Sequence, residues 1–150
     1  MHLNIAIKRS INKSVLCWLA TVNEHGIPNV SPKEIFTHFR KNSIIIANIA
    51  SPQTVQNIKQ NNQVCVSFID VLVQKGYQIK GKARLVQNGN EHYKEMHELL
   101  TGFTKGKFPI KSIIDISIEK VKPILAPSYT IYPETTEQEL INSAKQMYGI

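Results

Sequence analysis

Two short segments of this chain carry polar residues in spacings that suit ligand binding. The first is a strand-like run in which Asn29, Ser31 and Lys33 share one face. Val30 and Pro32 share the other face, and a proline within a strand indicates an edge or a bulge because it has no N–H to donate. A polar face beside such a proline is a place where a ligand can approach the backbone. An ordinary solvent-facing edge strand would show the same pattern.

The second segment, Asn48–Thr54, predicts the start of a helix, with Ser51 as its N-cap and Pro52 at its first position. A helix start has unpaired N–H groups and a partial positive charge, so it can hold a phosphate. The N–H groups of Gln53 and Thr54, together with the hydroxyls of Ser51 and Thr54, could converge on one anion. The alternative is that Ser51 only caps its own helix. Because one predicted central strand separates the two segments, we expect them to lie close together.

The other candidate motifs do not support catalysis. The segment Gly102–Lys107 resembles a phosphate-binding loop, but it is one residue short and lacks the serine or threonine that follows the lysine. His92 and His97 are five positions apart on a predicted helix, so they cannot bind one metal ion together. Cys17 and Cys65 lie in apolar, strand-like surroundings typical of small core residues. We therefore assign no catalytic residue and no metal site.

Length and composition favour one compact domain over residues 1–150. The chain has 42% hydrophobic residues and only two cysteines, so neither a disordered chain nor a disulfide scaffold is expected. Its apolar runs are too short for a transmembrane helix or a secretory signal. We expect a soluble, cytoplasmic protein without membrane association.

The net charge of +7, from 18 Lys and Arg against 11 Asp and Glu, favours anionic partners. Lys80, Lys82 and Arg84 alternate with apolar residues and should share one face of a strand. A solvated strand face explains this stripe, and a nucleic-acid-binding barrel is an alternative. Zinc-finger spacing, RNA-recognition aromatic motifs and long basic runs are all missing, so we predict no nucleic-acid partner.

Hydrophobic periodicity and turn residues predict a mainly β chain. The expected strands are 15–22, 29–39, 43–49, 64–69, 77–87 and 113–118. The expected helices are 3–13, 51–61, 91–100 and a terminal helix that follows the proline-bearing segment 123–133. Thr136 and Glu139 form a capping box at the start of that last helix. Six short strands with few helices indicate a small antiparallel barrel.

Four stretches of the chain, in this order and spacing, resemble the pyridoxamine 5'-phosphate oxidase-related, FMN-binding split-barrel family. They are Leu19–Val22, Gly26–Lys33, Ser51–Ile58 and Gly76–Ala83. The resemblance implies a six-stranded antiparallel Greek-key split β-barrel with a core at about residues 13–122 and a tail at 123–150. It also implies a homodimer that holds FMN at the subunit interface.

The resemblance places the cofactor on three parts of the chain. The first strand segment would run along the flavin, the end of the next strand would contact it, and the helix start would hold its ribityl chain or phosphate. Gln53 and Thr54 stand where many relatives have arginine and lysine, so phosphate binding would depend on hydroxyls and amides. The cofactor-binding residues that the resemblance implies are Asn29, Val30, Ser31, Pro32, Lys33, Ala47, Asn48, Ser51, Gln53 and Thr54.

The resemblance leaves the activity open. The chain lacks the C-terminal motif with arginine and tryptophan that binds substrate in the true oxidase, so oxidation of pyridoxamine phosphate is not expected. A flavin-dependent reductase, with NAD(P)H or another small molecule as its partner, is one hypothesis. A non-catalytic flavin carrier or sensor is a second, and the same barrel binding haem or a deazaflavin is a third.

Overall fold

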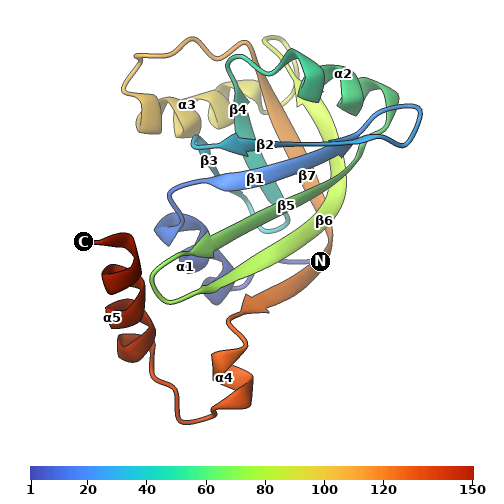
Figure 1. Cartoon of the computed structure of the whole chain (residues 1–150). Helices are drawn as coiled ribbons and strands as arrows, with labels where there is room; N and C mark the ends of the chain where they lie inside the picture. Colours follow the sequence, from blue (N-terminus) through green and yellow to red (C-terminus); the bar gives the residue numbers. More distant parts are fainter.

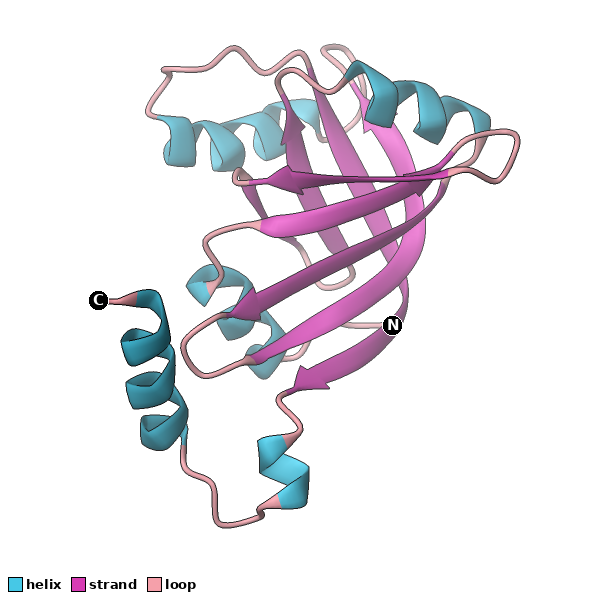
Figure 2. Cartoon of the chain, in the orientation of Figure 1, coloured by secondary structure: helices cyan, strands magenta, loops and turns pink.

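The computed structural model describes all 150 residues as one curled antiparallel sheet with flanking helices (Figures 1 and 2). Its strands are β1 (Cys17–Val22), β2 (Pro28–Lys33), β3 (Phe36–Phe39), β4 (Ser43–Asn48), β5 (Gln63–Asp70), β6 (Lys75–Val86) and β7 (Ser112–Leu125). Its helices are α1 (Ile5–Lys13), α2 (Pro52–Gln60), α3 (Tyr93–Thr104), α4 (Ser128–Ile131) and α5 (Glu137–Tyr148). The strand order is β2-β1-β5-β6-β7-β4-β3. None of the helices is long and apolar enough to cross a membrane.

The predicted split-barrel class is confirmed, but the sheet has seven strands and not six. The expected strand 29–39 is wrong, because it is divided into β2 and β3. β2 pairs only with β1, whereas β3 pairs only with β4 at the other end of the sheet. One straight strand cannot pair with β1 and with β4, which lie at opposite ends of the sheet. The chain therefore turns between Lys33 and Phe36.

β7 is longer than the predicted strand 113–118. It pairs with β4 as far as Ser117 and continues to Leu125 against β6 alone. Pro123 lies in this second part, where β7 has a neighbour on one side only. A proline is tolerated there because the missing N–H would not have bonded to another strand.

The interior of the barrel is filled by the larger of two apolar clusters. Ile7 and Ile11, one helical turn apart, point from α1 into this cluster and close one end of the barrel. α2 lies at the opposite end, next to β1 and β6 (Figure 1). The smaller cluster lies between α3 and the outer side of the sheet. All six residues of β4 are buried because both of its faces are covered.

The C-terminal part of the chain is fastened to the hairpin between β5 and β6. The predicted capping box is present at α5: Glu139 N–H donates to Thr136 Oγ1 (3.2 Å), and Thr136 N–H donates to Glu139 Oε2 (2.9 Å). Lys75 Nζ lies 2.7 Å from Glu137 Oε1, and the Tyr129 hydroxyl donates to the Val73 carbonyl. α5 thereby stays beside the barrel.

Candidate functional site

β2 turns its polar residues toward the inside of the barrel and its apolar residues toward solvent. Asn29 and Ser31 are half-buried and Lys33 is buried, whereas Val30 and Pro32 are exposed. The predicted division of these residues between two faces is confirmed. Its direction is the reverse of the usual arrangement, in which the apolar face of an antiparallel strand packs on the core.

The curl of the sheet brings β2 against the start of α2. The Lys33 ammonium donates to Ser51 Oγ, and the hydroxyl oxygens of Ser31 and Thr54 lie 3.4 Å apart. The prediction that the two polar segments lie together is confirmed. The reason differs from the one expected, because β2 and β4 are not neighbours in the strand order and meet only where the sheet curls round.

Lys33 is only 7% exposed and has no carboxylate partner among the ion pairs of the chain. Its cross-strand neighbour is Cys17. Burial raises the pKa of the Cys17 thiol to about 12, against the effect of the nearby Lys33 charge, so Cys17 stays neutral and supplies no counter-charge. Burial also lowers the pKa of the Lys33 ammonium. A buried cation without an anion is unfavourable, so this position suits an anionic ligand.

The start of α2 has no side-chain cap. Pro52 occupies the first helical position as predicted, but Ser51 makes no side-chain hydrogen bond to the helix amides. The alternative that Ser51 only caps its own helix is therefore wrong, since its hydroxyl accepts from Lys33 instead. The first turn also carries no acidic residue. The partial positive charge of the helix start is thus not balanced by any side chain.

Two of the predicted site residues use their side chains to hold the local structure. Asn48 Oδ1 accepts from Ser51 N–H (3.2 Å), and Asn48 Nδ2 donates to Ser112 Oγ (2.9 Å). Gln53 Nε2 donates to Asn57 Oδ1 (2.8 Å). Asn57 was not among the predicted site residues, although its place as a polar residue on the inner face of a predicted helix was a usable signal.

A pocket of about 300 Å³ lies beside Lys33 and Ser51. It is bounded by the turn between β2 and β3, by the end of β4 and by the loop before β7. Pro32 and Ala47, two further predicted site residues, also line it. Phe108 from the loop forms another part of the wall, and local sequence gave no signal for it.

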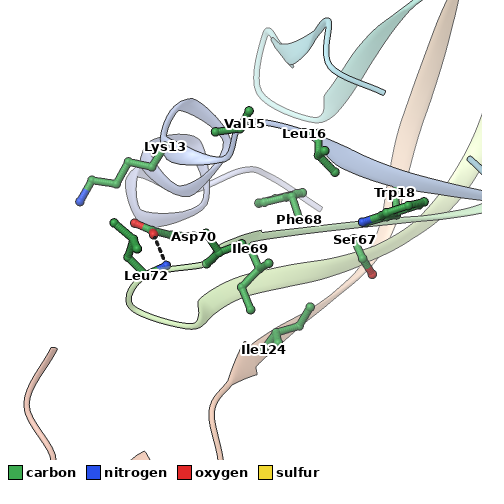
Figure 3. Close-up of a pocket in the computed structure, with 11 residues that line it drawn as sticks. Lys13, Val15, Leu16, Trp18, Ser67, Phe68, Ile69, Asp70, Leu72 and Ile124 are labelled. Atoms are coloured by element: carbon green, nitrogen blue, oxygen red, sulfur yellow. Dashed lines mark hydrogen bonds between the residues drawn. The ribbon is translucent and has the colours of Figure 1, made fainter. Parts of the chain in front are cut away.

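A larger pocket, about 670 Å³, lies elsewhere, next to the end of α1 and the start of β1 (Figure 3). Its lining is mostly apolar and includes Trp18, Phe68 and Ile124. It contains none of the predicted site residues, and the Asp70 carboxylate in it already accepts from Leu72 N–H (3.0 Å). We therefore place the polar chemistry in the smaller pocket, where the buried cation lies, and assign the larger one to apolar contacts.

The basic stripe on β6 is largely neutralised within the chain. Lys80, Lys82 and Arg84 are all exposed on one strand face, as predicted. Lys82 Nζ lies 3.5 Å from Glu119, and Arg84 Nε lies 2.8 Å from Asp115. Because two of the three cations have acidic partners, the stripe offers little support for a nucleic-acid-binding barrel.

The family model for pyridoxamine 5'-phosphate oxidase matches residues 3–124, so the chain belongs to this family, as the resemblance predicted. No curated protein sequence matches the chain. HupZ of Group A Streptococcus is 25% identical, with a TM-score of 0.67 over 79% of this chain and 91% of that one. An FMN-binding protein of Syntrophomonas wolfei is 18% identical (TM-score 0.67, 78% and 82% covered). HutZ, the heme storage protein of Vibrio cholerae, is 19% identical (TM-score 0.62, 83% and 96% covered).

We predict that Lys33→Met stabilises the ligand-free protein at neutral pH, because it removes a buried charge and keeps the length of the side chain. The pKa of Lys33 lies below its ordinary value of 10.5, so the folded protein loses this proton before the unfolded chain does. The wild-type penalty therefore shrinks as the pH rises toward 10.5, and the advantage of Lys33→Met should shrink with it. Urea midpoints measured from neutral to alkaline pH check this trend. Lys59→Met, at an exposed position on α2, is the control and should not show it.

Proposed function

We propose that this member of the pyridoxamine 5'-phosphate oxidase family binds FMN, with the phosphate between Lys33 and the start of α2. The observation that carries the proposal is the buried ammonium of Lys33, which forms no ion pair and lies next to an uncapped helix start. The family match and the FMN-binding protein among the similar structures support the choice of a flavin.

The donors around this point suit a phosphate dianion. The Lys33 ammonium supplies the charge, and the hydroxyls of Ser31, Ser51 and Thr54 lie in contact with it or with one another. The free amides of the first turn of α2 add donors with a favourable dipole. Charge-assisted hydrogen bonds of this kind are the strong ones in proteins. Lys33 would thus supply the positive charge at a site where Gln53 and Thr54 carry none.

The rest of the cofactor would lie along β2 and in the adjoining pocket. A volume of about 300 Å³ is at the lower end for a small-molecule site, so the pocket would hold only part of the flavin. Pro32, Ala47 and Phe108 offer apolar surface for a flat ring there. The bound flavin supplies the redox chemistry, and the protein places and orients it. We assign no catalytic residue.

We also propose that a second copy of the chain covers the outer face of β1 and β2. Trp18 is 47% exposed and Val30 is 59% exposed on this face, and Trp18 lies opposite the exposed Pro32 across the two strands. Trp18 also lines the apolar pocket of about 670 Å³, so the two apolar areas are continuous. Apolar surface of this kind marks an interaction site. A homodimer built on it would hold the flavin at the subunit interface.

Haem is the second candidate ligand, because the similar HutZ structure is that of a heme storage protein. The residues of this chain favour FMN, since the pocket beside Lys33 is lined by no histidine, cysteine, methionine or tyrosine that could bind the iron. Titrating the protein separately with FMN and with hemin distinguishes the two. Saturable hemin binding without FMN binding would overturn the flavin proposal.

The central prediction is that Lys33→Met weakens FMN binding by about 10- to 100-fold, the usual loss for one hydrogen bond to a charged group. The binding of riboflavin, which lacks the phosphate, should change much less. Flavin fluorescence titrations measure both dissociation constants, and Lys59→Met serves as the matched lysine control. Wild-type protein that binds no FMN, or a Lys33→Met variant with unchanged FMN affinity, would contradict the proposal.

For the dimer, we expect Trp18→Glu to give monomers, because it places a charge in the centre of the apolar face. Light scattering after size exclusion measures the molar mass of each variant. Leu99→Glu, at a similarly exposed position on α3, should leave the dimer intact. Monomeric wild-type protein at high concentration would refute the dimer proposal.

The reductase and carrier hypotheses differ in one measurement. Anaerobic addition of NADH or NADPH to the FMN-loaded protein should bleach the flavin band if the protein is a reductase. A flavin band that stays unchanged with both donors would favour a carrier or sensor.

A further inference from the structure

A buried polar contact joins α2 to β1. Asn57 and Thr21 are 1% and 3% exposed, and Asn57 Nδ2 donates to Thr21 Oγ1 at 3.0 Å. The other polar side-chain atom of Asn57, Oδ1, accepts a hydrogen bond from Gln53 Nε2. The neighbouring inward residue of the helix, Ile58, makes only apolar contacts in the barrel core. Asparagine has a low helix propensity, so Asn57 does not stabilise α2 as a helix former. Its side-chain hydrogen bonds give another reason for its presence at this position.

The contact lies one helical turn along α2 from Thr54, which is part of the proposed phosphate site. Thr54 precedes Asn57 by three residues and so lies on the same face of α2. Thr54 reaches Ser31 on β2, while Asn57 reaches Thr21 on the neighbouring strand β1. β1 in turn is paired with β2 up to Lys33. The two contacts therefore join one face of α2 to β2, which carries Lys33, and to β1, which is paired with β2.

We propose that the hydrogen bond from Asn57 to Thr21 is the positioning contact that sets the start of α2 against Lys33. It thereby determines how strongly the site prefers a phosphorylated ligand to its unphosphorylated form. This inference rests on the proposed FMN function. Neither Asn57 nor Thr21 touches the ligand; both act through the placement of Ser51 and Thr54.

The hydrogen bond from Asn57 can position α2 more precisely than apolar packing can, because the two kinds of contact differ in directionality. Packing of Ile58 holds α2 on the barrel but is non-directional, so it tolerates small shifts and rotations of the helix. A hydrogen bond is directional and fixes the helix along its axis and about it. A binding site loses affinity when its groups are displaced by about 0.5 Å, and in the proposed site the phosphate is the part of the ligand that depends most on the start of α2. A ring that lies along β2 would depend less on this placement.

The test compares three variants by their dissociation constants for FMN and for riboflavin and by their melting temperatures. Thr21→Val keeps the shape but removes the acceptor, and we expect it to lower the ratio of FMN to riboflavin affinity about tenfold, as for a weakened charged hydrogen bond. Thr21→Ser keeps the hydroxyl and should preserve the wild-type ratio. Ile58→Val weakens the apolar packing of the same helix, so its melting temperature should fall while the ratio stays unchanged.

Two results would overturn the inference. One is a folded Thr21→Val protein with the wild-type ratio, and the other is an Ile58→Val protein whose ratio falls as far as that of Thr21→Val. If Thr21→Val does not fold, the double variant Thr21→Val with Asn57→Leu leaves no buried polar group unpaired and should show the same low ratio. Wild-type protein that binds neither FMN nor riboflavin would refute the proposed function itself. Wild-type protein that binds FMN and riboflavin with equal affinity would refute the phosphate site and this inference together.

Discussion

An ammonium group held out of water without a carboxylate to neutralise it is the constraint on which the site depends. The hydrogen bond from Lys33 to the Ser51 hydroxyl offsets only part of the cost of removing that charge from water. An anion beside Lys33 would offset the rest and raise its pKa toward the ordinary value. Ligand binding and the stability of the fold are therefore linked, since whatever binds the folded state alone stabilises it by mass action.

The reversed polarity of β2 follows from the same constraint. A strand at the edge of a sheet ordinarily turns its apolar side chains to the core, yet here Val30 faces solvent and Lys33 faces inward. The proposed assembly would account for both faces, because an anion and α2 would cover the inner one and a second copy of the chain would cover the outer one. In that case the pattern of β2 would suit the assembly better than the isolated barrel.

The sequence correctly predicted those features of the fold that depend on residues close together in the chain. The start of α2 at Pro52 and the capping box of α5 were predictable because each depends on residues within one helical turn. The break between β2 and β3 was not, because it depends on two different partner strands at opposite ends of the sheet. The same holds for the site. Lys33 and Ser51 could be nominated from sequence, but the burial of Lys33 and the wall formed by Phe108 arise only when the sheet curls.

The position of Lys33 would allow the proposed site to do without a cation at the start of α2. Thr54 is 1% exposed and touches Ser31, so a lysine at that position would place a second ammonium in the buried region of Lys33. Two like charges so close and so poorly hydrated would repel each other strongly until an anion arrived. With Lys33 on β2 and no cation at the start of α2, the proposed site avoids this cost. It also means that the proposed phosphate would bridge β2 and α2, two elements that no backbone ladder joins, so its binding would hold the curled sheet closed at the place where its strand pairing is interrupted.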